Sequence, residues 1–294
     1  MQLERLVPHS DAGISAQAYI ERFDIGALIR GLADDGFRLI ELGGDLSLFF
    51  PNVFSPAAVD QLAALRSEYG IQYTVHLPLW SVEPSTSFKP VRMGSVNVIT
   101  EVIRATLPLA PEVYVLHATG ALAAEFSRMH LPAIVRSAIL RQFQHQARRS
   151  IEEILADTGI VSRQIAIETI EFPFELMLDL AEQLDLGICF DTGHVLAGFS
   201  GAVDLFDALT ACLPRLAEVH LHDAPWQGPG QRIGYGTDHR TLGQGDLDSG
   251  RLLDVLAASH YEGPIIFELS VQQTHESLDL LRTIRPDFVR ASTL

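Results

Sequence analysis

The chain has 294 residues, of which 47% are hydrophobic and 20% are charged, and this composition excludes a disordered or fibrous protein. Its 21 basic and 37 acidic residues give a formal net charge of −16, which argues against tight binding to duplex DNA, because a wide phosphate footprint needs clustered positive charge. The sequence has no apolar run of about 18 residues or more and no signal-peptide pattern, so we expect a cytoplasmic protein without a membrane span.

Short β-branched segments alternate along the chain with longer segments of helical periodicity. The expected strands, in chain order, are residues 6–9, 37–42, 71–76, 113–117, 164–170, 186–190, 217–222 and 264–269. The expected helices are residues 19–35, 55–69, 96–107, 131–157, 174–184, 204–213, 247–259 and 275–284. The second of these helices has the clearest ends, because Ser55 and Pro56 suit a helix start and Gly70 suits a helix end.

Eight strand–helix units predict a parallel sheet, and eight units in 294 residues fit a closed (β/α)8 TIM barrel of the α/β class. We therefore expect a single TIM-barrel domain over residues 1–294. An open doubly wound sheet is the alternative, but it usually carries a glycine-rich phosphate turn after its first strand, and the sequence has no such motif. Long connections at residues 77–95 and 224–246 are expected to build the active site, because loops after barrel strands usually do so.

Six consecutive expected strands carry a metal-capable side chain at or near the same end. These side chains are His76, His117, Glu168, Asp191 with His194, His220 with His222, and Glu268. The carboxyl ends of barrel strands converge on one mouth, and imidazole with carboxylate suits Zn²⁺, Mn²⁺, Fe²⁺ or Co²⁺. Any one of them, taken singly, could be an ordinary polar residue at a strand end. Together they predict a metal site, because unpaired carboxylates inside a barrel mouth would be costly without cations.

Seven segments, in order, resemble the xylose isomerase-like TIM barrels, a superfamily that includes sugar isomerases and epimerases and the endonuclease IV-type phosphodiesterases. The segments are residues 74–78 (TVHLP), 115–117 (VLH), 165–169 (IAIET), 190–194 (FDTGH), 219–223 (VHLHD), 242–248 (LGQGDLD) and 267–269 (FEL). The resemblance runs from about residue 37 to residue 285 and implies the barrel fold. Residues 106–117 also resemble, less closely, the cobamide-remodelling phosphodiesterases, which is a hint about substrate type only.

The resemblance implies two ligand arrangements. The epimerase-like arrangement has one ion, held by Glu168, Asp191, His220 and Glu268, and the two glutamates also move the proton between carbons. The endonuclease-like arrangement has three zinc ions. There His76 and His117 would join Glu168 at the first ion, the epimerase-like set would hold the second, and His194 and His239 would hold the third.

This chain departs from the endonuclease-like pattern at two positions. An aspartate is expected two residues before His239, but Thr237 stands there and Asp238 is adjacent, so either the register slips by one residue or the third ion is weak or absent. His222 stands where the nucleases carry an asparagine. It points the same way along its strand as His220, so it is either an extra ligand or a substrate contact.

Two chemistries fit these residues. Metal-assisted hydrolysis of a phosphoester uses several ions, whereas isomerisation or epimerisation of a sugar needs one ion and a glutamate that moves a proton. Ligand count favours hydrolysis, because four residues already close a one-ion set and several histidines are then surplus. The candidate catalytic residues are Glu168, Glu268 and His194. A barrel that binds a ligand without catalysis is the remaining alternative.

We expect one to three divalent ions per chain, of Zn, Mn, Fe or Mg, and a small sugar or sugar-phosphate substrate. The acidic charge disfavours duplex DNA as a partner. Trp80, Trp226 and Arg240 are candidate substrate contacts together with His222, although loop packing and a solvated charge are ordinary alternatives for the first three. Glu41 could orient a ligand histidine from behind.

Overall fold

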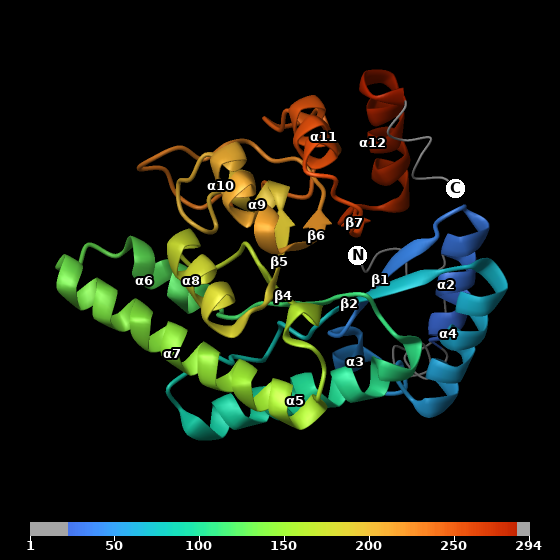
Figure 1. Cartoon of the computed structure of the whole chain (residues 1–294), viewed down its shortest axis with the longest axis horizontal. Helices are drawn as coiled ribbons and strands as arrows, with labels where there is room; N and C mark the ends of the chain where they lie inside the picture. The colour runs from blue at the N-terminus through green and yellow to red at the C-terminus, as the bar shows by residue number, and fades with distance from the viewer. Residues whose placement is uncertain (1–22, 287–294) are drawn as a thin grey trace, which may run out of the picture.

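The computed structural model describes residues 23–286 of the chain (Figure 1). Within residues 23–286, seven strands form one parallel sheet in the order of the sequence, and β1 also contacts β7, so the sheet forms a nearly closed barrel. The strands are β1 (Leu39–Gly43), β2 (Gln72–His76), β3 (Tyr114–Leu116), β4 (Ile165–Glu168), β5 (Gly187–Asp191), β6 (Leu216–His220) and β7 (Ile265–Ile266). The prediction of a TIM barrel is confirmed, whereas the strand expected at residues 6–9 lies outside the described residues.

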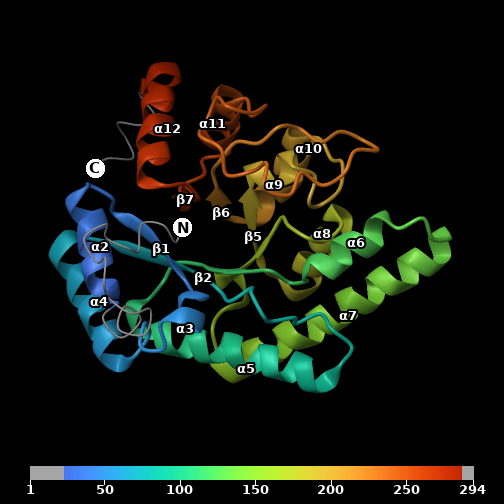
Figure 2. The same ribbon diagram turned by 180° about the vertical axis from the view of Figure 1, so that it is seen from behind.

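Helices cover the outside of the barrel, and neighbouring helices such as α2 and α4, or α5 and α7, pack side by side (Figure 2). The helices are α2 (Ile25–Asp34), α3 (Leu46–Phe49), α4 (Pro56–Tyr69), α5 (Lys89–Thr106), α6 (Ala121–Arg128), α7 (Ala133–Thr158), α8 (Phe174–Leu184), α9 (Thr192–Leu196), α10 (Leu205–Cys212), α11 (Ser249–Ala258) and α12 (Val271–Ile284). Within residues 23–286, none of these helices has both the length and the apolar character needed to cross a bilayer.

The ends of α4 follow the predicted signals. The side chain of Ser55 accepts a hydrogen bond from the backbone N–H of Ala58, and Pro56 occupies the first helical position. Gly70 ends the helix in the left-handed region, with φ of 68°. The helix α2 begins at Ile25, because Asp24 is extended and caps the helix through the N–H of Ala27. Residues 19–22 of the expected helix lie outside the described residues.

The start of α5 is seven residues earlier than predicted, so the connection after β2 covers only residues 77–88. The buried positions of the early turns are Arg92, Ser95, Val96 and Ile99, which have helical spacing. Two of them are polar, so hydrophobic periodicity alone could not mark the first two turns. Three short helices, α3, α6 and α9, were not predicted.

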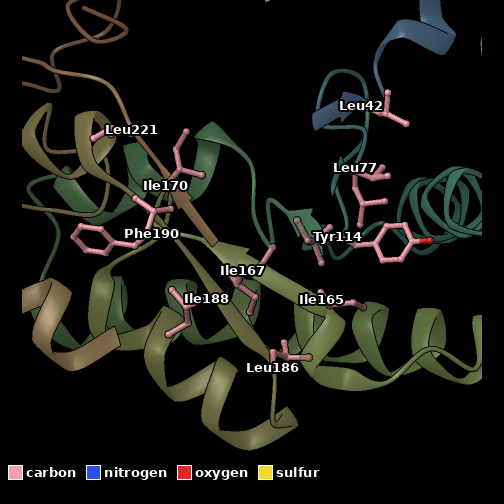
Figure 3. Close-up of a cluster of buried hydrophobic side chains, with 14 of the residues drawn as sticks. Leu42, Leu77, Tyr114, Ile165, Ile167, Ile170, Leu186, Ile188, Phe190 and Leu221 are labelled. Atoms are coloured by element: carbon pink, nitrogen blue, oxygen red, sulfur yellow. The ribbon is translucent and has the colours of Figure 1, made fainter. Parts of the chain in front are cut away.

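Side chains alternate between the two faces of each barrel strand. Ile165 and Ile167 of β4 and Ile188 and Phe190 of β5 belong to the main core between barrel and helices (Figure 3). The intervening residues point into the barrel, where a second, small apolar cluster is formed. That cluster consists of Val113, Val115, Ala166 and Cys189. Two residues further along each of these strands, the same inner faces carry the polar side chains of the barrel mouth.

The long connection between β6 and α11 is ordered by the buried side chain of Asp223. Its carboxylate accepts hydrogen bonds from the backbone N–H groups of four residues, all at 2.9 Å: Ala224, Gly243, Gly245 and Leu247. Asp223 and Arg240 also exchange two backbone hydrogen bonds. The expectation of a long loop at this position is therefore confirmed, and one buried carboxylate fixes both of its ends.

Candidate metal centre

The first cluster of metal-capable side chains joins three neighbouring strands. His76 ends β2, His117 follows β3 directly, and Glu168 ends β4. The Nε2 atoms of the two histidines lie 3.1 and 2.8 Å from Oε2 of Glu168. Their other ring nitrogens face further oxygen atoms: Nδ1 of His76 lies 3.0 Å from the carbonyl oxygen of Leu77, and Nδ1 of His117 lies 3.5 Å from Oε2 of Glu171, too far for a good hydrogen bond. Both rings are therefore oriented with Nε2 toward the shared carboxylate.

The second cluster consists of Glu168, Asp191 and His220, all buried, whose ligand atoms lie within 4.8 Å of one another. Nδ1 of His220 lies 3.7 Å from Oδ2 of Asp191, 4.0 Å from Oε1 of Glu168 and 3.3 Å from Oε1 of Glu268. Donor atoms placed about 2 Å from one tetrahedral zinc ion are separated by about 3.3 Å, so these spacings suit a shared ion. Glu168 thus presents Oε2 to the first cluster and Oε1 to the second.

The third cluster lies beside the other two and contains His194, His222, His239 and Glu268. The carboxylate of Asp238 adjoins it, with Oδ2 3.3 Å from Nε2 of His194 and 3.2 Å from Nδ1 of His239. Nε2 of His239 lies 3.2 Å from Oε2 of Glu268.

The residue that supplies a carboxylate to this third cluster is Asp238 and not Thr237. The hydroxyl of Thr237 donates to the carbonyl oxygen of Gly234 at 2.7 Å, within its own turn. His239 has φ of 55°, in the left-handed region that is costly for a residue with a side chain. This backbone conformation accompanies the approach of two consecutive side chains, Asp238 and His239, to the same cluster. Of the two alternatives from the sequence, the geometry agrees with the one-residue slip.

The three clusters bring several carboxylates and imidazoles close together, and this proximity shifts their pKa values. Burial lowers the pKa of His117, but the negative charge and hydrogen bonds of Glu168 and Glu171 outweigh it and raise that pKa to about 10. Burial also lowers the pKa of His239, but the hydrogen bonds that Asp238 and Glu268 accept from its ring outweigh burial and raise that pKa to about 9. Burial raises the pKa of Glu168, but the surrounding histidines hold it well below its usual range. In effect, protons on histidines supply the positive charge that these carboxylates require.

This donor set fits divalent metal ions. Both ring nitrogens of His220 are buried without a hydrogen-bond partner of good geometry, which is costly unless a further group binds there. Histidine nitrogens and carboxylate oxygens in groups of three or four are the usual ligands of zinc and of other first-row ions. Each of the eight predicted metal ligands belongs to at least one of these clusters, namely His76, His117, Glu168, Asp191, His194, His220, His239 and Glu268. That they bind metal stays a prediction.

Three further candidates for substrate contact, of which Arg240 is only partly exposed, lie in the loops around the barrel. Trp80 is 49% exposed and meets Phe49 edge-on, with 6.1 Å between ring centroids, and Trp226 is 48% exposed. The guanidinium of Arg240 donates to the carbonyl oxygen of Gln244, 3.2 Å away in its own loop. Within residues 23–286, we find no hydrogen bond or ion pair that joins Trp80, Trp226 or Arg240 to the three clusters. Their contact with substrate remains a prediction.

Sequence reasoning missed two carboxylates next to the candidate ligand histidines. Glu171 lies beside His117, and its left-handed backbone, with φ of 58°, left no mark in the sequence. Glu218 lies beside His220, with 3.5 Å between its Oε1 and Nε2 of the histidine. The alternation of strand residues could have found it, because Glu218, His220 and His222 occupy every second position of one segment and share a face.

Known proteins share this architecture. A family model described as "Xylose isomerase-like TIM barrel" matches residues 29–284. The chain belongs to this family. An uncharacterized protein of Methanocaldococcus jannaschii is 26% identical to it over 241 residues, which are 78% of this chain and 75% of that protein.

Among solved structures, this xylose isomerase-like barrel is similar to proteins with two different activities. A D-tagatose 3-epimerase-like protein superposes with a TM-score of 0.68 and 21% identity, over 90% of this chain and 94% of that one. Endonuclease IV from Thermus thermophilus superposes with a TM-score of 0.64 and 19% identity, over 89% of this chain and 94% of that one. Identities this low show a shared fold, and the fold serves both activities, so the reaction has to be argued from the site.

Proposed function

We propose that this family member is a metal-dependent hydrolase that cleaves a phosphoester bond in a small sugar-phosphate-containing substrate, and that it uses two or three divalent ions. The observation that carries the proposal is the position of Glu168. Its two oxygens face two different groups of ligands, Oε2 toward His76 and His117 and Oε1 toward Nδ1 of His194 at 2.8 Å and Nδ1 of His220 at 4.0 Å. A carboxylate between two ligand groups is the arrangement that a pair of neighbouring ions requires.

The residues divide among the ions as follows in this proposal. The first ion would be held by His76, His117 and Glu168, and the second by Glu168, Asp191, His220 and Glu268. The third would be held by His194, His239 and Asp238, which would take the place of the missing aspartate at Thr237. When bound, such ions lower the pKa of water and stabilise negative charge on the attacking and leaving oxygens of an ester.

The protein's own contribution is to hold these ligands rigidly. The N–H of His194 donates to Oδ1 of Asp191 at 2.6 Å, and the N–H of Asp191 donates to the hydroxyl of Thr169 at 2.9 Å. Glu171 orients His117 from behind. Fixed ligands of this kind keep the metal geometry constant while a substrate binds and leaves. We expect a small-molecule substrate, because a protein with a net charge of −16 is poorly suited to bind the phosphate backbone of duplex DNA.

A second candidate function is isomerisation or epimerisation of a sugar or sugar phosphate. Glu168 and Glu268 both face Nδ1 of His220, so the second cluster alone offers two carboxylates at one ion site. In this alternative, one ion polarises the substrate and the two glutamates move the proton. The similarity in fold to the D-tagatose 3-epimerase-like protein supports this candidate. It leaves four histidines without a metal-binding role: His76, His117, His194 and His239.

Metal content separates the two candidates. We expect the full chain, purified without added metal, to hold two or three Zn, Fe or Mn ions by elemental analysis and to hydrolyse phosphodiesters, including nucleotide-loop cofactors. His117→Ala should lose one ion and most of the hydrolytic rate. His145→Ala, an exposed histidine on α7, is the matched control and should keep both.

Two other results would contradict the proposed hydrolase. One Mn or Mg ion that survives in His117→Ala, together with activity on ketoses or their phosphates, would establish the isomerase. A protein that takes up no metal, even after reloading, would overturn both enzyme functions and leave a ligand-binding barrel.

A further inference from the structure

Two carboxylates lie beneath the metal centre, on the inner side of His220. Nδ1 of this buried histidine faces Asp191 and Glu268 at the barrel mouth, so Nε2 points the opposite way, into the barrel. There it lies 3.4 Å from Oε2 of Glu41 and 3.5 Å from Oε1 of Glu218. The histidine is thus placed between the metal ligands above and a carboxylate pair below.

The barrel brings this pair together from distant parts of the chain. Glu41 belongs to β1 and Glu218 to β6, and these strands are not neighbours in the sheet, so their side chains meet in the interior. The hydroxyl of Thr74 donates to Oε1 of Glu218 at 3.2 Å. Cys189, in register with Glu218 on the adjacent strand, belongs to the small apolar cluster inside the barrel.

Burial of Glu218 at this position costs free energy of folding, which suggests that its carboxylate has a functional role. Its side chain is fully buried, and its Oε2 atom has no hydrogen-bond partner, as is also true of Oε2 of Glu41. A buried carboxylate destabilises a fold unless it is paired, and an apolar residue of similar size would cost less at this position. Among the described residues, both carboxylates lie within ion-pair distance of the same ring nitrogen, Nε2 of His220.

We propose that Glu218, acting together with Glu41, is a positioning residue for His220. In the metal-bound protein, these carboxylate oxygens, which lie 3.4 and 3.5 Å from Nε2 without a formed hydrogen bond, would accept the single ring hydrogen of the neutral imidazole. This leaves the lone pair on Nδ1, aimed at Asp191 and Glu268. Leu77 does the same for His76 through its carbonyl oxygen, and Glu171 does so for His117. At His220 the acceptors come from the barrel interior, where water does not compete. The inference rests on the proposed metal centre.

Zinc binding to the full chain tests the proposal, with zinc alone as the probe and a chromophoric chelator as the competitor. Glu218→Leu should weaken one zinc site by about ten- to a hundredfold, the usual range for loss of a group behind a metal ligand, without changing the number of sites. The metal-free variant should unfold at the same temperature as the wild type or higher, since a buried carboxylate is removed. A purely structural role would not lower affinity while stability rises.

Two further variants complete the design. Glu218→Gln keeps an oxygen that can accept from Nε2 and should stay within about threefold of the wild-type zinc affinity. Thr100→Val is the matched control, because Thr100 is also buried with an unpartnered oxygen but lies in α5, outside the barrel. Its zinc affinity should equal that of the wild type.

Several results would overturn the inference. One is a Glu218→Leu protein that binds zinc within twofold of the wild type, and another is an equal loss in the Leu and Gln variants. Disappearance of a whole ion with no change at the others would mean that Glu41, Glu218 and His220 form an ion site themselves. A wild type that binds no zinc would overturn the proposed metal centre as well, so that failure is distinguishable.

A measurement that needs no change at Glu218 guards against a variant that fails to fold. Nitrogen-15 spectra of the zinc-loaded, histidine-labelled wild type report which ring nitrogen carries hydrogen, and the signals of His220 are those lost in His220→Asn. Hydrogen on Nε2 and none on Nδ1 is expected. Hydrogen on Nδ1 would overturn the inference.

Discussion

The backbone N–H of His239 donates a hydrogen bond to Nδ1 of His222 at 2.9 Å, and the two imidazole rings stack with 4.2 Å between their centroids. An N–H group can only donate, so Nδ1 of His222 must carry a lone pair. The neutral ring then has its hydrogen on Nε2, which lies 2.9 Å from Oδ2 of Asp191. This geometry disfavours His222 as a metal ligand and favours it as the donor that orients Asp191.

Two substitutions of His222 separate its two hydrogen bonds. His222→Gln can place an amide N–H near the position of Nε2, so it should keep the bond to Asp191 and a zinc affinity within about threefold of the wild type. His222→Asn reaches only the N–H of His239, so zinc should bind about tenfold more weakly. Competition with a chelator measures both. Equal affinities for the two variants would exclude this role for His222.

Gly193→Ala should displace the same ring. A Cβ atom at Gly193 would lie 2.0 Å from Nδ1 of His222, and His222 is fully buried. We expect a loss of roughly 1–3 kcal/mol in the free energy of unfolding, as for an overpacked core, together with weaker metal binding.

Helical glycines with open space around them provide the control for this change. Gly31→Ala in α2 and Gly94→Ala in α5 should leave the free energy of unfolding unchanged or raise it by up to about 1 kcal/mol. Urea unfolding monitors all three variants. A Gly193→Ala protein as stable as these controls would show that the ring of His222 can move.

Asp238 and Thr237 are adjacent but should respond differently to substitution. Asp238→Asn removes the charge that lies between Nε2 of His194 and Nδ1 of His239, so the weakest-bound ion should be lost or bind at least about tenfold more weakly. Thr237→Val removes only the hydroxyl bond to Gly234 and should leave the metal content unchanged. Elemental analysis after dialysis decides between them. A loss of metal in the Thr237 variant alone would restore the register implied by the resemblance.

Metal affinity should rise with pH. The pKa values of His117 and His239 are raised to about 10 and about 9 from the ordinary 6.5, so both rings are protonated at pH 7 in the metal-free protein. A metal ion must displace these protons, and zinc affinity should therefore increase from pH 6.5 to about 10. Calorimetry at pH 7 in two buffers of different ionisation enthalpy should show more than one proton released per chain. Binding without proton release would contradict these pKa values.

The stability of the metal-free chain should change in the opposite direction. A histidine whose pKa is higher in the folded state stabilises the fold fully below pH 6.5, and this contribution disappears as the pH rises through about 9 to 10. Glu218, whose pKa is raised to about 8 by burial and by the charge of Glu41, has the same sign, since its contribution is lost as the pH rises through about 8. The midpoint of thermal unfolding should therefore fall between pH 6.5 and pH 10.

Much of the architecture could be predicted because it depends on local patterns. The capped helix α4 and the apolar strand segments around Ile165 and Ile188 were recognisable from residue types at a short spacing. The early turns of α5 were not, because their buried faces carry Arg92 and Ser95. Arg92 is 2% exposed and forms two hydrogen bonds of 2.9 Å with Glu153, a partner 61 residues away that no local pattern could supply.

Residue types and their spacing were enough to predict the class of the fold and the residue types at the barrel mouth. Alternation within strands and their repetition along the chain place His76, Glu168, His220 and Glu268 at one end of a parallel barrel. Which atom of each side chain faces which neighbour could be seen only in the folded barrel. The two oxygens of Glu168, the lone pair on Nδ1 of His222 and the carboxylate pair beneath His220 depend on contacts between strands far apart in sequence, and such contacts exist only after the barrel has closed.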